Sequence, residues 1–281
     1  MSIMKKLREY LNRPLSFVMF LLIIISTVIT ALTVVFIIGY IFIKGVPNLS
    51  LDLFSLKYSS SNQSMLPSII NTVYLTALTL LLSVPIGIFS AIYLAEYSRK
   101  NSFFVKIINI ANETLSGIPS IVYGFFGFLA FVISKKWGYS LLAGVITLAI
   151  MVLPLIIRTS QEAMLGVDNT FREASYGLGA GKLRTVFKIV LPSAMPGILS
   201  GIILAIGRIV GETAALIYTA GTVPEAATKL TSSSRTISVH LYCLLNEGLY
   251  TEQAYATAVV LIVFVVIINA LSNALAKKIM K

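Results

Sequence analysis

The chain has 281 residues, of which 57% are hydrophobic and only 12% are charged, and its net charge is +11. This composition is typical of integral membrane proteins and excludes an ordinary soluble enzyme. A single cysteine, Cys243, and a single histidine, His240, exclude an internal disulfide and a metal site built on several such residues.

Apolar runs long enough to cross a bilayer recur along the chain. Five are uninterrupted, whereas a sixth is preceded by the polar residues Asn109, Asn112 and Glu113. We expect this sixth helix to begin only at Leu115 and to follow an amphipathic lead-in. The sequence therefore predicts an all-α integral membrane protein with six transmembrane helices, at residues 17–43, 69–94, 115–133, 139–157, 194–218 and 254–276.

The first 16 residues form a separate N-terminal segment in this interpretation. Ile3, Leu7 and Leu11 recur at helical spacing opposite charged residues, which favours a short helix lying in the membrane interface. The apolar run after it is too long for a signal peptide, so we expect a retained first helix. Residues 17–281 then form the transmembrane domain.

The basic residues are distributed unequally between the two sides of the membrane. Fifteen of the 22 Lys and Arg residues flank the spans on the side of both termini and of residues 158–192, and six lie on the other side. The positive-inside rule therefore predicts that both termini and the 158–192 loop are cytoplasmic. Since the basic residues flank spans and form no stripe interleaved with aromatic residues, nucleic acid binding is not expected.

The polar loop at residues 158–192 has an internal pattern of its own. Thr170 and Glu173 fit a capping box, in which the Thr170 hydroxyl and the Glu173 carboxylate each accept the other residue's amide. Gly177 or Gly179 can end this helix through a left-handed residue. We expect a helix, a glycine bend and a second helix that stands off the membrane and inserts into a cleft of another protein. An ordinary capped loop is the alternative.

The same loop excludes one route to nucleotide binding. Residues 177–182 suggest a phosphate-binding P-loop, but Tyr176 occupies the position of its first glycine and Leu183 that of its Ser or Thr. Any work driven by ATP therefore needs a partner protein.

Two opposite charges, Arg208 and Glu212, lie four residues apart in the fifth predicted span. A charge at that depth costs at least about 2.5–3.5 kcal/mol, so it is retained where it meets protein, water or a ligand. Gly197, Gly201 and Ala205 share the same helical face, and small residues allow close helix approach. We expect this face to meet another helix or a central pathway. The alternative is an ion pair that only locks the bundle.

The loop also contains a pattern that extends beyond a capping box. It comprises Glu173, Ala174, Ser175, Gly179, Ile189, Leu191 and Pro192. This spacing resembles the EAA loop of ABC-importer permeases, the cytoplasmic segment by which a membrane subunit docks on its ATPase. Ser175 replaces the second alanine of the family and is small enough to fit. We call residues 158–192 the EAA-like loop.

Further segments narrow the resemblance. They lie at residues 71–76, 84–87, 91–97, 117–124 and 207–216. The Gly-Ile-Pro-Ser and Gly-Arg-x-x-Gly-Glu-Thr-Ala sequences among them resemble the PstA-type permeases of phosphate ABC importers. The resemblance implies the type I ABC-importer permease fold and a bacterial or archaeal plasma membrane location. It also implies that Arg208 and Glu212 line the substrate pathway, where the planar guanidinium suits a tetrahedral oxyanion.

The resemblance also implies partners. These are a PstC-type permease in a heterodimer, two PstB-type ATPase subunits that use ATP and Mg²⁺, and an external phosphate-binding protein. The chain itself would bind no cofactor and would not be an enzyme. An ABC permease for another oxyanion, such as molybdate or sulfate, is the nearest alternative. A secondary transporter or channel acting alone would predict an internal inverted repeat, and none is convincing in the sequence.

Overall fold

The computed structural model describes residues 14–98 and 102–279, and every regular element in these two ranges is helical. Most of the predicted N-terminal segment, residues 1–16, lies outside them, and residues 14–16 begin the first helix. Five described helices are long and apolar enough to cross a membrane, or six if one sharply bent pair counts as a single span. The all-helical class is therefore as predicted.

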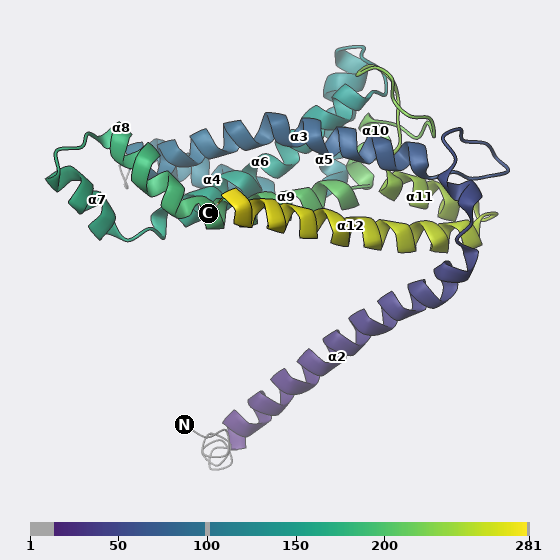
Figure 1. Cartoon of the computed structure of the whole chain (residues 1–281), viewed down its shortest axis with the longest axis horizontal. Coiled ribbons are helices and arrows are strands. Elements are labelled where there is room, and N and C mark those ends of the chain that lie inside the picture. The colour runs from purple at the N-terminus through teal and green to yellow at the C-terminus, as the bar shows by residue number, and fades with distance from the viewer. Residues whose placement is uncertain (1–13, 99–101, 280–281) are drawn as a thin grey trace.

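The long helices correspond to five of the predicted spans. They are α2 (Pro14–Gly45), α3 (Leu66–Ile92), α6 (Leu141–Leu165), α9 (Leu191–Gly211) and α12 (Thr251–Ile279). All but α2 lie side by side in one bundle (Figure 1). The main buried cluster lies between α3, α6 and α9, where Leu75, Leu148 and Ile209 are buried. Burial of such side chains against one another fixes how these helices pack.

The first helix, α2, diverges from the bundle and meets it at its C-terminal end (Figure 1). Gly45 allows this approach, because a Cβ there would collide with Tyr255 and Val259 of α12. The rings of Tyr40 and Tyr255 also pack edge-on, with centroids 5.9 Å apart. Most other apolar side chains of α2 are exposed, which suits a helix surrounded by lipid or by another membrane chain.

Shorter elements lie at the two ends of the bundle. α7 (Asn169–Gly177) and α8 (Lys182–Thr185) project from one end, and α11 (Ile237–Glu247) lies at the other (Figure 1). At the α11 end, the buried amide of Asn71 makes three hydrogen bonds of 2.8 to 3.2 Å to the loop before α11. Two 3₁₀ turns, Val46–Asn48 and Leu51–Phe54, belong to the connection from α2 to α3.

The predicted continuous helix at residues 115–133 is wrong. The structure has α4 (Phe103–Gly117), then α5 (Ser120–Gly127) continued by a π-helical stretch, η4 (Phe128–Ser134), with a bend of 101° between the two parts. Pro119 causes the break, because it lacks a backbone N–H and disfavours helical angles at the preceding Ile118. Ile118 accordingly has φ −71° and ψ 130°. The expected amphipathic lead-in is therefore a separate helix.

The predicted span at residues 194–218 is also interrupted. α9 ends at Gly211, and a short helix, α10 (Ala214–Thr219), follows. Glu212 is extended, with φ −71° and ψ 129°, and its carboxylate accepts a hydrogen bond from the amide of Ala215 at 3.2 Å. Glycine and β-branched threonine are both unfavourable inside a helix, so Gly211 and Thr213 weaken the helix on either side of Glu212.

Candidate functional site

The first helix of the EAA-like loop, α7, is capped differently from the prediction. Asp168 is the N-cap, and its carboxylate accepts hydrogen bonds from the amide and the hydroxyl of Thr170, each at 2.9 Å. The predicted capping box of Thr170 with Glu173 is therefore wrong, because the helix begins two residues earlier than that box requires, at Asn169. These hydrogen bonds stabilise the charged carboxylate and lower the pKa of Asp168.

The bend after α7 is made as predicted by Gly179, which has a left-handed φ of +80°. The amide of Gly179 donates to the carbonyl of Tyr176 at 2.9 Å, and that of Ala180 donates to Ser175 at 3.1 Å. These bonds satisfy carbonyl groups at the end of the helix. Glycine suits this position because a side chain disfavours left-handed backbone angles.

The second helix of the loop does not stand apart from the membrane span. α8 continues through a π-helical turn, η5 (Val186–Val190), into α9, so that Lys182–Gly211 is one helix of 30 residues. The π turn ends two residues before Pro192, whose ring would clash with the carbonyl four residues before it in a regular α-helix. A displacement of α8 therefore acts directly on α9.

The helices α7 and α8 form the two arms of the loop, and they are joined by Ser175 of α7 and Thr185 of α8. Their buried hydroxyl groups lie 2.8 Å apart and form a hydrogen bond. An alanine at position 175, as in the family pattern, could not make this bond. The replacement that seemed neutral in the sequence therefore gives the loop an additional internal contact.

The outer surface of the loop has the character of a protein-binding surface. Glu173, Ala174 and Pro192 are exposed, whereas Ile189 and Leu191 are half-buried. Several large apolar side chains are exposed beside them: Phe171, Tyr176, Leu178 and Leu183. A cavity of about 410 Å³ lies within the bend, lined by Ser175, Leu178, Gly179, Ala180, Arg184, Lys188 and Ile189. Clustered exposed apolar residues next to a hollow are typical of an interaction site.

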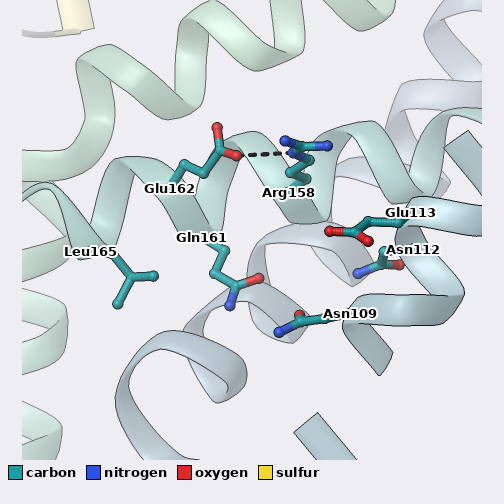
Figure 2. Close-up of a pocket in the computed structure, with 7 residues that line it drawn as sticks. All are labelled: Asn109, Asn112, Glu113, Arg158, Gln161, Glu162 and Leu165. Carbon is teal, nitrogen blue, oxygen red and sulfur yellow. Dashed lines mark hydrogen bonds and ion pairs between the residues drawn. The ribbon is translucent and has the colours of Figure 1, made fainter. Parts of the chain in front are cut away.

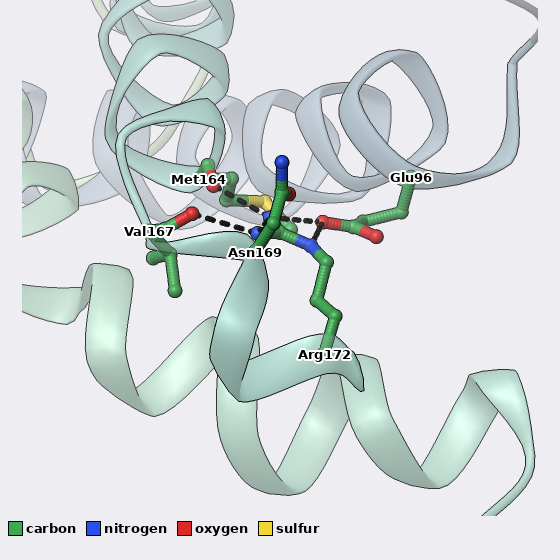
Figure 3. Close-up of polar contacts among 5 residues, drawn as sticks. All are labelled: Glu96, Met164, Val167, Asn169 and Arg172. Carbon is green, nitrogen blue, oxygen red and sulfur yellow. Dashed lines mark hydrogen bonds and ion pairs between the residues drawn. The ribbon is translucent and has the colours of Figure 1, made fainter. Parts of the chain in front are cut away.

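Behind this surface, Arg172 of α7 binds back to the bundle (Figure 3). Its guanidinium donates to Glu96 Oε1 from Nη2 at 2.7 Å and from Nε at 3.1 Å. It also donates to the carbonyls of Met164 at 2.8 Å and Val167 at 2.7 Å, and to Asn169 Oδ1 at 3.3 Å. No local pattern in the sequence indicates such a role for Arg172 or Glu96.

The second candidate site is the break between α9 and α10. Arg208 lies in the last turn of α9 and is half-buried. Within the described residues it makes no hydrogen bond or ion pair, although it lies close enough to Tyr123 to interact electrostatically. Glu212, only 8% exposed, binds the amide of Ala215 instead. The i, i+4 ion pair of the alternative interpretation is therefore not formed, and Arg208 is available to another partner.

The face of small residues that leads to Arg208 packs on α6. A Cβ at Gly197 would collide with Ala163, and one at Gly201 would collide with Thr159. The expected close approach of a helix is thus present. These glycines meet α6 rather than an open pathway.

A third polar group lies where α4 crosses α6 (Figure 2). It surrounds a cavity of about 200 Å³, and its members are Asn109, Asn112, Glu113, Arg158, Gln161 and Glu162. The apolar Leu165 completes the lining of the cavity. Arg158 and Glu162 form an exposed ion pair at 2.9 Å. Such a surface is unfavourable against lipid, so it is expected to face water or protein.

A bundle of membrane-length helices, a loop with exposed apolar side chains, and an arginine near a helix break that has no partner among the described residues are together typical of a membrane transport subunit. Residues 83–281 match the family described as "Binding-protein-dependent transport system inner membrane component". The chain belongs to this family.

Curated relatives and solved structures agree with this assignment. The chain is 32% identical to a probable ABC transporter permease protein of Bacillus subtilis, YqgI, over 82% of this chain and 84% of that protein. It is 35% identical to the phosphate transport system permease protein PstA of Haemophilus influenzae, over 77% of each chain. A bacterial ABC transporter for the polysaccharide alginate shares the fold, with a TM-score of 0.67 at 18% identity over 99% of this chain and 100% of that one.

Proposed function

We propose that this chain is the membrane permease subunit of an ATP-driven importer that moves inorganic phosphate across the plasma (inner) membrane. The main structural support for phosphate as the substrate is Arg208, a half-buried guanidinium without a partner in the described part of the chain. A guanidinium stays charged at any relevant pH and donates paired hydrogen bonds to a tetrahedral oxyanion. The similarity to phosphate transport permeases supports this choice.

The arrangement of the bundle suggests how substrate and energy enter. The EAA-like loop and the end of α12 lie toward one end, which we assign to the cytoplasm on the positive-inside rule (Figure 1). The α11 end then faces outward, toward an external phosphate-binding protein. Glu212 holds the start of α10 just beyond Arg208, so its role on the pathway is to order the break rather than to neutralise the arginine.

Energy enters through the EAA-like loop in this proposal. Glu173, Ala174, Ser175, Gly179, Ile189, Leu191 and Pro192 position the surface that docks on a PstB-type ATPase, which binds ATP and Mg²⁺. Because α8 runs without interruption into α9, a displacement of the loop by the ATPase would move the helix that carries Arg208.

The chain is proposed to act beside a PstC-type permease in a complex with two ATPase subunits. The polar group between α4 and α6 and the exposed apolar length of α2 supply surfaces that such a neighbour would cover. A second membrane chain would remove the polar group from lipid at a lower cost than leaving it exposed.

Reconstitution into proteoliposomes tests the proposal. The complex of this chain with its partner permease, ATPase and binding protein should take up radiolabelled phosphate only when ATP is supplied on the ATPase side. Preferential uptake of molybdate or sulfate over phosphate would favour the oxyanion alternative. Uptake by this chain alone, without ATPase, would favour a secondary transporter.

A further inference from the structure

The helix α7 is attached to the bundle by polar contacts and not by hydrophobic packing. Within the described residues it contributes no side chain to any of the four buried hydrophobic clusters, and its one buried residue is Ser175. By contrast, η5 contributes Val186 and Val190 to the cluster that joins the ends of α3, α6 and α9. The position of α7 therefore depends on polar contacts, chiefly those of Arg172 and Ser175.

The Arg172 contact is both buried and multiple. The side chains of Arg172 and Glu96 are 13% and 7% exposed, whereas those of the exposed pair Arg158 and Glu162 are 58% and 62% exposed. Exposed pairs of this kind contribute little because water screens them. A buried guanidinium that also binds two backbone carbonyls has few alternative geometries, so the pair is rigid as well as strong.

Glu96, the partner of Arg172, lies at the end of a membrane-length helix. Glu96 belongs to η3 (Tyr93–Tyr97), the π-helical turn that ends α3. The next residue, Tyr97, has Lys182 of α8 over its ring, with Nζ 4.9 Å from the centroid. Both arms of the EAA-like loop are therefore attached to consecutive residues of one turn at the end of α3.

Arg172 holds the end of α6 as well. Its Nη2 group donates to the carbonyl of Met164, which lies in the last turn of α6. Its Nη1 group donates to the carbonyl of Val167, which lies two residues beyond the end of α6. Carbonyls at a helix C-terminus lack partners within the helix and attract cations. One side chain thus connects α7 to two membrane-length helices that are far apart in sequence.

We propose that Glu96 and Arg172 form a strut that makes α7 move as one body with the inner ends of α3 and α6, so that ATPase movement at α7 reaches the spans. The inference rests on the proposed function in one respect, that α7 is where the ATPase docks. Arg172 and Glu96 are positioning residues in this view, because neither needs to touch the ATPase or the substrate.

Glu96→Gln is the most informative variant. The glutamine can still accept a hydrogen bond from Arg172, so the loop folds, but the charge attraction is lost. In proteoliposomes holding the whole complex, we expect the variant to assemble with its ATPase and to hydrolyse ATP. Phosphate moved per ATP hydrolysed should fall at least fivefold. Lys278→Gln, which removes an exposed charge in the last turn of α12, is the control and should leave this ratio unchanged.

Arg172→Lys adds a graded test, because lysine keeps the charge but cannot reach all the acceptors. We expect a ratio between those of wild type and Glu96→Gln. A purely structural role predicts instead that assembly and ATP hydrolysis fall together while the ratio stays at the wild-type value. That outcome, or a normal ratio in Glu96→Gln, would overturn the strut.

A second measurement requires no phosphate and so separates this inference from the substrate assignment. Spin labels at Thr170 of α7 and Phe89 of α3, both exposed, report the distance between the two helices in a Cys243→Ser background. In the complex, this distance should be the same with and without ATP, and Glu96→Gln should make it change or broaden with ATP. A distance that already changes in the parent complex would refute the strut even if phosphate transport is confirmed.

Discussion

Arg208 and Glu212 lie four residues apart in the sequence, but the end of α9 at Gly211 separates their side chains. Glu212 binds the amide of Ala215 at 3.2 Å, and Arg208 has no hydrogen-bonding or ionic partner in the described ranges. This weakens the interpretation of the two charges as a pair that only locks the bundle. A half-buried arginine that no described residue neutralises is better suited to meet an anion.

Arg208→Gln should abolish phosphate uptake while the complex still assembles. If the two charges were paired, removing Arg208 would leave a buried glutamate unpaired and cost about 3–5 kcal/mol. Since Glu212 has its own partner, we expect the amount of assembled complex to stay close to that of wild type. Uptake normalised to assembled complex is the measurement.

Two further variants sharpen this test. Arg208→Lys keeps the charge without the planar fork, so it should transport poorly if phosphate is bound through two hydrogen bonds and well if charge alone suffices. The double variant Arg208→Gln with Glu212→Gln should remain inactive. Wild-type uptake by the double variant would make Arg208 a structural residue and remove the main physical argument for phosphate.

The EAA-like loop yields a second prediction. Glu173 is exposed, so Glu173→Arg should leave the fold intact and reduce co-purification of the ATPase with the tagged permease. Gly179→Leu should have the same effect through the bend, because a side chain at φ +80° costs about 1–2 kcal/mol. Glu225→Arg makes the same charge change in an exposed position before α11 and serves as the control. Normal ATPase binding and transport in both loop variants would disprove the docking role.

The orientation yields a third prediction, based on two exposed lysines. Cysteines placed at Lys182 and at Lys229 in a Cys243→Ser background should react from opposite sides of the membrane. In intact cells, a membrane-impermeant thiol reagent should label the cysteine at position 229, and the one at position 182 should react only after the membrane is permeabilised. Equal labelling of the two in intact cells would overturn the assignment of the loop to the cytoplasm.

What could be predicted from the sequence were features with a local cause. Apolar length marked the long helices, and a glycine in the right place marked the left-handed bend at Gly179. The stripe of Gly197 and Gly201 correctly indicated a close helix contact. In each case the residues that determine the structure are neighbours along the chain or along one helix face.

Competing local signals explain the errors. Apolar composition favoured one helix over residues 115–133, but Pro119 separates α4 from α5 with a bend of 101°. Asp168 was a better cap than Thr170, since a carboxylate two residues earlier already satisfies the Thr170 amide. The bond between Arg172 and Glu96 joins residues 76 positions apart, and no periodicity in a single sequence can reveal such a contact.

His240 of α11 provides the last prediction, because its imidazole is fully buried and neither ring nitrogen has a hydrogen-bond partner in the part of the chain that the structure describes. Desolvation, together with the nearby positive charge of Arg235, lowers the pKa of His240 from 6.5 to about 3. Between these values the unfolded chain binds a proton that the folded chain does not. Stability therefore falls as the pH falls through this window, by about 1.4 kcal/mol per pH unit.

His240→Leu should remove this dependence, since it replaces a neutral buried ring with an apolar side chain. Carboxylates also titrate in part of this range, so the quantity to measure is the difference between the two proteins. The thermal unfolding midpoint of wild type, in the detergent-solubilised complex, should fall more steeply than that of the variant from pH 6.5 to pH 5. The free-energy difference over that interval should be about 2 kcal/mol. Parallel profiles for the two proteins would mean that His240 is not buried as the structure indicates, or that α11 opens before the bundle unfolds.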